Sequence, residues 1–246
     1  TYHNMILIAI FILFIIYLIV KTYLNKTHSY WDKQPVSTTY KKSGLITDRK
    51  QPPIKNNNYI LKEYTEIELP HIITHLNKHF IREYSYSNEY IKWYFAHSQN
   101  MTLCLLKRNL SLIGTISSIH ITLSLDNKKL GLGYVDFLAI NKDYRNKRLA
   151  PLLISNLIDK SNEKIFIFKI EQTPLPFNHI LKFRYYGYLI PPNLKYLNNF
   201  NEINRTNITR VFQFYKTNSI KFILKQTYSF DEFNYWFIPR QGVINS

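Results

Sequence analysis

The sequence predicts an α+β domain preceded by one long apolar helix. An uncharged apolar run lies near the N-terminus. The globular region has two helical segments, then three strand-like runs, then a strand–loop–helix–strand unit. Of the 246 residues, 46% are hydrophobic and 16% aromatic, which excludes a disordered chain. Because 32 Lys and Arg stand against 16 Asp and Glu, the net charge of +16 favours a partner that carries phosphate.

The apolar run Met5–Val20 predicts a transmembrane anchor over residues 1–25. Extended to Leu24 it reaches about 20 residues, which as a helix span about 30 Å of hydrocarbon. A cleaved signal peptide is disfavoured because no basic segment precedes the run, and a buried core helix because the run is apolar on every side. The lysines that follow predict a single-pass membrane protein whose globular domain faces the cytosol, at an intracellular membrane or in a virion.

Composition divides the rest of the chain near Asn58. Residues 26–58 carry Pro, Thr and Lys and predict an extended linker, and residues 59–246 predict the globular domain. Periodicity predicts helices at Glu66–Phe80, Asn88–Ala96 and Leu149–Asp159, and strands at Tyr59–Tyr64, Met101–Lys107, Leu112–Leu125, Leu130–Ile140 and Lys164–Ile170. The last two strands and the helix between them predict a βαβ-like unit.

A basic loop leads directly into the helix expected at Leu149–Asp159, with cations at Lys142, Arg145, Lys147 and Arg148. Backbone N–H groups at a helix N-terminus lack partners and carry about half a positive charge, so this loop predicts a cradle for a diphosphate. The spacing Arg145-x-x-Arg148-x-Ala150 also fits the Q/R-x-x-G-x-G/A pattern of acyl-CoA-dependent N-acetyltransferases, with Arg in place of the first Gly. A solvated basic surface is the alternative.

Four segments carry a longer pattern. They are Asp136–Pro151 (DFLAINKDYRNKRLAP), Tyr30–Val36 (YWDKQPV), the helix from Tyr86 through Trp93, and Leu175–Pro176 followed by Arg184–Tyr186 and Pro191. In this spacing they resemble the segments NFLCVHKKLRSKRVAP, FWDTQPV, YSPEFLLWAL and LPKPVGTCRYWHRSLNP of the eukaryotic N-myristoyltransferase family. The resemblance implies a GNAT-like acyl-CoA N-acyltransferase fold, of which this chain has a single half.

The resemblance also implies a site. The backbone amides of Phe137 and Leu138 are expected to form the oxyanion hole that polarises the thioester of an acyl-CoA, myristoyl-CoA in the family, which is a co-substrate rather than a prosthetic group. The acceptor is expected to be the N-terminal glycine amine of a peptide. Residues expected to hold the CoA are Arg145, Asn146, Lys147, Arg148, Leu149, Ala150 and Pro151, with Tyr30 and Trp31 of the linker alongside it.

The acceptor side departs from the family. Ile170–Thr173 replaces a YTAG-like stretch, and Glu171 there is a candidate substitute base. In the family the C-terminal carboxylate deprotonates the amine, a role that Ser246 would have to fill here. Only Phe233–Phe237 resembles the opening of the family's second half, so a partner chain is a candidate to supply the rest. Two functions therefore stay open. One is an active acyltransferase, and the other is a catalytically inactive acyl-CoA-binding, lipid-binding or structural membrane protein, such as one of a large DNA virus particle.

Other candidate sites are weaker. His71, His75 and His79 recur at helical spacing, but no carboxylate or Cys accompanies them, so we expect a solvated histidine face and no metal site. Cys104, the one cysteine, excludes a disulfide framework and is expected to pack inside a strand. For Asp136 we expect cross-strand pairing. The aromatic residues are not interleaved with the basic ones, which disfavours nucleic acid as a partner.

Overall fold

The computed structural model describes residues 2–24, 30, 31, 34, 52–80, 86–169 and 202–243. The chain forms two compact units, one of Thr1–Leu45 with Thr173–Arg184 and the other of Ile46–Gln172 with Tyr185–Ser246. The first contains α1 (Tyr2–Leu24). Across the described residues, no helix combines the length and the apolarity that crossing a membrane requires. The anchor expected over residues 1–25 therefore has no support from the structure, and the cytosolic or virion location stays a prediction.

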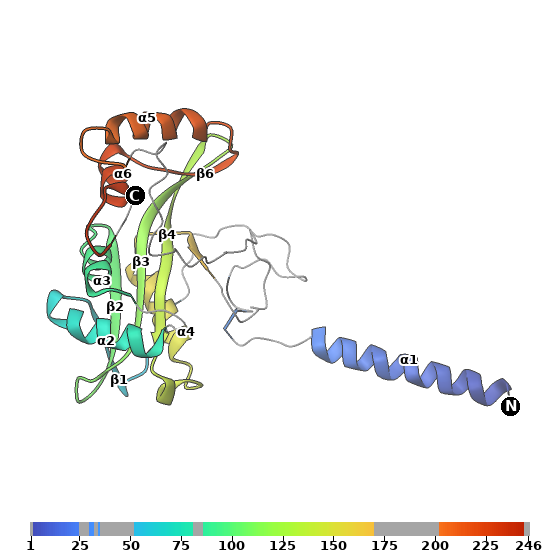
Figure 1. The fold of residues 1–246 in the computed structure, drawn as a ribbon. Helices are drawn as coiled ribbons and strands as arrows, with labels where there is room; N and C mark the ends of the chain where they lie inside the picture. The colour runs from blue at the N-terminus through green and yellow to red at the C-terminus, as the bar shows by residue number, and fades with distance from the viewer. Residues whose placement is uncertain are drawn as a thin grey trace, which may run out of the picture. The chain divides into compact units, whose positions relative to one another are not determined.

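The second unit is built on one sheet (Figure 1). Its strands run in the order β1 (Tyr59–Glu63), β2 (Asn100–Lys107), β3 (Leu112–Leu125), β4 (Lys128–Ile140) and β5 (Phe166–Phe168), and β6 (Leu224–Thr227) pairs with β3. All of these pairs are antiparallel except β4 with β5, which is parallel. Helix α4 (Leu149–Lys160) connects these two strands, so the predicted βαβ unit is confirmed.

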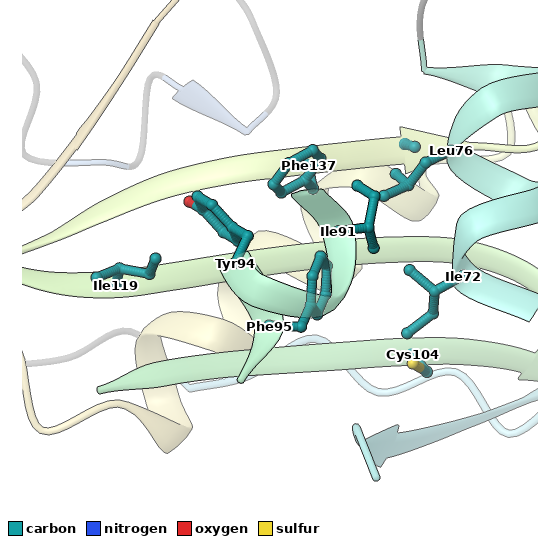
Figure 2. Close-up of a cluster of buried hydrophobic side chains, with 9 residues drawn as sticks. Ile72, Leu76, Ile91, Tyr94, Phe95, Cys104, Ile119 and Phe137 are labelled. Atoms are coloured by element: carbon teal, nitrogen blue, oxygen red, sulfur yellow. The ribbon is translucent and has the colours of Figure 1, made fainter. Parts of the chain in front are cut away.

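One face of the sheet is covered by α2 (Leu69–His79) and α3 (Asn88–Phe95) (Figure 2). The buried cluster on this face consists of Ile72, Leu76, Ile91, Tyr94, Phe95, Cys104, Ile119, Phe137 and Ala139. Burial raises the pKa of the Cys104 thiol to about 12, and the expectation that this residue packs inside a strand is confirmed. Helix α2 follows a short 3₁₀ turn, η2 (Glu66–Glu68), and Ser87 Oγ caps α3 by accepting from Tyr90 N at 3.0 Å.

Helix α4 covers the opposite face. Its buried leucines pack on strand residues that alternate with those of the first face, so that Leu103 and Leu105 of β2 point to α4 and Cys104 between them points to α2. The end of the expected linker also contacts α4. Ile54 N donates to Ser155 Oγ at 3.0 Å, and Asn156 Nδ2 donates to the Ile54 carbonyl oxygen at 3.0 Å.

The C-terminal part consists of α5 (Ile208–Ser219), β6 and α6 (Phe230–Phe237), which lie at the far end of the long β3–β4 hairpin (Figure 1). Ile208, Phe212 and Phe233 form its buried cluster. Helix α6 also packs against α3, since the Trp236 ring lies 4.9 Å from those of both Trp93 and His97. The C-terminal part is thereby connected to the helix that carries Tyr94.

Candidate active site

A β-bulge interrupts β4 at the predicted oxyanion residues. Ser117 pairs with Asp136 and Thr115 pairs with Ala139, so Phe137 and Leu138 together stand opposite the single residue Ile116. Phe137 has a φ of 51°, in the left-handed region that bulky side chains avoid. Such a conformation costs on the order of 1–3 kcal/mol, and bulges of this kind concentrate next to active sites.

The Phe137 amide points to a side chain of its own strand. Its N–H donates to Asp136 Oδ1 at 2.7 Å. The carbonyls around it are held by the partner strand, because Thr115 Oγ1 donates to the Phe137 carbonyl oxygen at 3.0 Å and Ser117 Oγ donates to that of Asp136 at 3.2 Å. The cross-strand pairing expected for Asp136 is confirmed by its register with Ser117. The hydrogen bond that the Phe137 amide donates to the Asp136 carboxylate was not predicted from the sequence.

The Phe137 ring packs in an aromatic cluster against α3, and this packing holds the bulge in place. It is fully buried, and Figure 2 shows it beside Tyr94, Phe95 and Ile91 of α3. Its centroid lies 4.8 Å from that of Tyr94, 5.5 Å from that of Phe95, 5.5 Å from that of Phe80 and 5.2 Å from that of Tyr86. Aromatic pairs at these distances add packing energy beyond the buried area, so this cluster offsets the cost of the positive φ.

The predicted phosphate loop follows the bulge. It contains a 3₁₀ turn, η3 (Lys142–Tyr144), and ends at α4, whose N-cap Arg148 makes no side-chain capping bond. Asn146 and Arg148 both have positive φ, at 63° and 57°. Left-handed residues in a loop turn successive N–H groups toward a common concavity, and an uncapped helix N-terminus adds donors and positive potential. The backbone therefore has the form of an anion site.

The side chains of this loop have separate roles. Arg145 Nη2 donates to the His79 carbonyl oxygen at 3.0 Å, so its guanidinium is bound to the C-terminal end of α2. Lys147 Nζ lies 4.5 Å from the centroid of the Tyr144 ring, and Leu149 is buried in the core under α4. Asn146 and Arg148 are exposed at the loop, while Ala150 and Pro151 form the half-buried first turn. Of the two arginines, Arg148 is the one placed at the helix N-terminus itself.

The left-handed φ of Arg148 explains why the acetyltransferase pattern has Gly there. We expect Arg148→Gly to be more stable than Arg148→Ala by about 1 kcal/mol, because only Gly adopts φ 57° without a Cβ clash. Urea unfolding of the two variants measures the difference. Arg210, exposed in α5, is the control, and there the Ala variant is expected to be the more stable one. Equal stability of the two Arg148 variants contradicts the assignment of strain.

Two histidines connect α2 to the site. His75 Nε2 donates to the Ala139 carbonyl oxygen at 3.3 Å, and Lys142 N donates to His79 Nδ1 at 3.4 Å. Both rings are buried and lie 4.9 Å apart, so the expected solvated histidine face is wrong for these two and correct for the exposed His71. In the described part of the chain, no group of three or more His, Cys, Asp or Glu is arranged to hold a metal.

These histidines predict a loss of stability in mild acid. Burial is the main cause that lowers the pKa of His75 to about 4 from 6.5. Burial and the nearby cations Lys78, Lys142 and Arg145 lower that of His79. Between pH 6.5 and 4 the unfolded chain therefore binds more protons than the folded chain, so stability falls as the pH falls through this window.

We expect the unfolding free energy to drop by about 2–3 kcal/mol between pH 7.5 and pH 4.5, as measured by urea titration at each pH. His75→Phe is expected to flatten this dependence, because the variant has no group to protonate at that position. His71→Gln, a change at the exposed histidine of the same helix, is expected to keep the slope. An unchanged slope in His75→Phe contradicts the role given to His75.

Several predicted residues are not placed at this site. Glu171, Ser246 and the acceptor-side stretch lie outside the described residues. Tyr30 and Trp31 belong to the first unit, where their rings lie 4.9 Å apart, and their contact with CoA stays a prediction. The bulge, the positive-φ arginine and the basic loop do come together in one continuous segment between Asp136 and Pro151.

Residues 54–170 match the family model described as the N-terminal domain of Myristoyl-CoA:protein N-myristoyltransferase. The matched segment, just under half of the chain, is therefore similar to the N-terminal domain of the N-myristoyltransferases. A protein of Amsacta moorei entomopoxvirus assigned as a glycylpeptide N-tetradecanoyltransferase is 28% identical over 228 residues, 89% of this chain and 73% of that protein. The glycylpeptide N-tetradecanoyltransferase of Dictyostelium discoideum is 28% identical over 160 residues, 56% of this chain and 38% of that enzyme.

The crystal structure of Saccharomyces cerevisiae N-myristoyltransferase with bound myristoyl-CoA shares the fold, with a TM-score of 0.68 and 18% identity. The likeness covers 89% of this chain and 64% of the yeast chain, so the chain spans less than two thirds of that structure. The expected α+β, GNAT-like fold is thereby confirmed. Homology to N-myristoyltransferases is distant, and what the yeast protein binds is a property of that protein.

Proposed function

We propose that this N-myristoyltransferase-like chain binds an acyl-CoA, with myristoyl-CoA as the first candidate, and transfers the acyl group to the N-terminal glycine amine of a peptide. The observation that carries the proposal is the bulge at Phe137 and Leu138, placed directly upstream of a basic loop and an uncapped helix N-terminus. The relatives support it, because the Dictyostelium discoideum enzyme carries the name glycylpeptide N-tetradecanoyltransferase and the Amsacta moorei entomopoxvirus protein is assigned the same activity.

In the proposed reaction the amine nitrogen attacks the carbonyl carbon of the thioester, and the carbon–sulfur bond breaks to release CoA as a thiol. Negative charge gathers on the carbonyl oxygen in the transition state. Backbone N–H donors at Phe137 and Leu138 are proposed to stabilise that charge, and a fixed donor of this kind contributes about 10²–10³-fold in rate. The N-terminus of α4 and the Arg148 side chain are proposed to hold the diphosphate of CoA.

The test is an acylation assay with the full chain, myristoyl-CoA and a peptide that begins with glycine. We expect a mass increase of one myristoyl group on the free peptide and none on the same peptide with an acetylated N-terminus. Loss of the signal on acetylation places the product at the α-amine. Absence of product at enzyme concentrations equal to those of the peptide contradicts transfer.

Binding without transfer is the second candidate. The observation that favours it is the Asp136 carboxylate, which accepts from the Phe137 amide at the place that a thioester oxygen would need. Calorimetric titration with myristoyl-CoA distinguishes the two candidates. Saturable binding together with no acylated peptide supports the binding protein, and saturable binding with turnover supports the transferase.

A further inference from the structure

The far end of the β3–β4 hairpin, where Figure 1 shows α5 and β6, exposes several large apolar side chains. Segment Ile220–Ile223 connects α5 to β6 at this end. Its Ile220 and Ile223 each have 72% of their surface exposed, and Phe222 has 54%. Large apolar side chains that are exposed together mark a surface that meets a membrane, a ligand or another protein.

The hairpin tip extends this apolar surface. Asp126 N, in the β3–β4 turn, donates to the Ile223 carbonyl oxygen at 2.9 Å. The residue before it, Leu125 of β3, lies directly opposite Leu224 of β6, and both are nearly half exposed. Directly opposed residues of an antiparallel pair lie side by side on one face of the sheet. A groove of about 720 Å³ between α5, β6 and α6, lined in part by Phe222 and Leu224, continues the apolar area.

Four lysines lie among these apolar residues. They are Lys128 and Lys129 after the hairpin turn, and Lys221 and Lys225 of the run IKFILK. We call residues 125–129 and 220–225 together the end surface. Asp126 is its one acidic residue, and the chain has no Asp or Glu from residue 203 to residue 230. The end surface therefore combines exposed apolar side chains with an excess of positive charge.

Hydrogen bonds hold the end surface in shape. Asp126 and Asn127 have φ of 47° and 63°, the positive values of a two-residue turn that matches the twist of a hairpin. Thr227 Oγ1 donates to the Thr122 carbonyl oxygen at 3.3 Å, which ties β6 to β3. The Tyr215 hydroxyl of α5 donates to the carbonyl oxygen of Gln226 in β6. The exposed apolar side chains are thus presented by a paired sheet and a docked helix.

The lysines distinguish among the partners that such a surface could have. Lys is depleted from the cores of protein–protein interfaces, where charge has to be desolvated. Segments that lie in the interface of a bilayer combine Phe and Leu with Lys, whose ammonium groups reach anionic headgroups while their methylene stems lie along apolar surface. The run IKFILK has this combination. Its charge is complementary to an anionic lipid surface.

We propose that the end surface docks on an anionic lipid bilayer. Ile220, Phe222 and Ile223 enter the boundary between headgroups and acyl chains, and the four lysines contact the anionic headgroups. Helix α1 and the basic loop before α4 take no part in this docking. The inference does not depend on acyl transfer, because none of the residues of the end surface belongs to the proposed active site.

The first test is co-sedimentation of the full chain with vesicles. One preparation is phosphatidylcholine with about 30% phosphatidylserine, and the other is phosphatidylcholine alone. We expect Ile223→Ser to lower partitioning onto the anionic vesicles about tenfold, because an apolar side chain no longer leaves water. Ile67→Ser is the matched control. Ile67 is 81% exposed in η2, beside α2 at the other end of the hairpin, and its loss is expected to change partitioning less than twofold.

The second test removes charge from the end surface. Lys128→Gln combined with Lys221→Gln is expected to lower partitioning about 10- to 30-fold, because each lysine near an anionic bilayer contributes about fivefold. Lys55→Gln combined with Lys92→Gln removes the same charge from exposed positions outside the end surface and is expected to have less than a twofold effect. At 500 mM salt the difference between the two double variants is expected to shrink, because salt screens the attraction.

A local probe shows which part of the chain meets the lipid. Cys104 is the one cysteine and is fully buried, so Ile223→Cys introduces an accessible thiol that takes a polarity-sensitive dye. We expect the dye emission to move to shorter wavelength when anionic vesicles are added. The labelled Ile67→Cys variant is expected to show no such change. Thermal unfolding of every variant checks that it is folded before the comparison.

Three results would each overturn the inference. One is equal binding of the full chain to the two vesicle preparations. Another is equal partitioning of Ile223→Ser and Ile67→Ser, which would assign any lipid contact to another part of the chain. The third is a change in the emission of labelled Ile223→Cys with rising protein concentration and no vesicles, which would make the end surface a contact between proteins. The acylation assay tests the proposed function separately, so a failure of vesicle binding leaves that proposal intact.

Discussion

Replacing the Phe137 amide with an ester is expected to lower the rate of peptide acylation by about 10²–10³-fold. The ester keeps the side chain and removes only the N–H at the bulge, so the loss measures stabilisation of the developing oxyanion. An α-hydroxy acid incorporated at this position by nonsense suppression makes the change. Single-turnover acylation measures the chemical step apart from product release.

The same exchange at Leu138 is expected to lower the rate by a similar factor, since both residues stand opposite Ile116 at the bulge. Affinity for a non-hydrolysable thioether analogue of myristoyl-CoA is expected to change less than threefold in either case, because a ground-state carbonyl carries little charge. An ester at Asn218, near the exposed end of α5, is the control for the chemistry of incorporation. A rate unaffected at both Phe137 and Leu138 would remove these amides from the mechanism.

The architecture of the second unit was accessible from the sequence because its signals are local. Alternation of apolar residues located the long β3 and β4 strands, and the basic loop ahead of Leu149 marked the start of α4. The bulge in β4 has no such local signal in the sequence. A positive φ at Phe137 arises from the packing of its ring among α2 and α3, and tertiary packing of this kind has no periodic signature.

The burial of His75 and His79 in α2 could have been predicted from their spacing, but this pattern was not used. Ile72, His75, Leu76 and His79 recur at the spacing of one buried helix face, and all of them are buried. Because Ile72 and Leu76 are apolar, their helix face is expected to pack on the core, and the two histidines on that face are expected to be buried with them. Their backbone partners, the Ala139 carbonyl and the Lys142 amide, lie more than sixty residues away and could not be read from any local pattern.

Helix α5 was missed for a different reason. Its segment follows an Asn-rich run, and of its apolar residues only Ile208 and Phe212 are buried, while Phe214 is exposed. What holds this helix is α6, whose Phe233 ring lies 5.1 Å from that of Phe212. A helix of twelve residues depends on such packing for its stability, so its own sequence gives a weak signal.

The bulge and the phosphate loop form one mechanical unit. His75 holds the Ala139 carbonyl, which follows the bulge, and His79 and Arg145 hold the loop that comes next. All three contacts anchor the segment to α2, so the amides of Phe137 and Leu138, proposed as the oxyanion hole, and the helix N-terminus keep a fixed separation along the chain. A thioester and a diphosphate that belong to one CoA molecule require such a fixed separation.

Reversing the charge at the start of α4 is expected to weaken acyl-CoA binding selectively. We expect Arg148→Glu to raise the Kd for myristoyl-CoA by about 10- to 100-fold, because a carboxylate replaces a cation beside the diphosphate at a helix N-terminus. The fold is expected to be unaffected, since Arg148 is exposed and Glu meets the same φ constraint as Arg. Calorimetric titration at 50 mM and 500 mM salt measures the effect, which screening reduces at the higher concentration.

A thioester that lacks the nucleotide separates the diphosphate from the rest of the ligand. With myristoyl-pantetheine, Arg148→Glu and the unmodified chain are expected to bind equally, because this ligand has the acyl chain and the thioester but no phosphate. Arg205→Glu makes the same charge change in an exposed turn before α5 and is expected to leave the Kd for myristoyl-CoA within about twofold. If Arg148→Glu and Arg205→Glu weaken myristoyl-CoA equally, the effect comes from net charge and the start of α4 is not the diphosphate site.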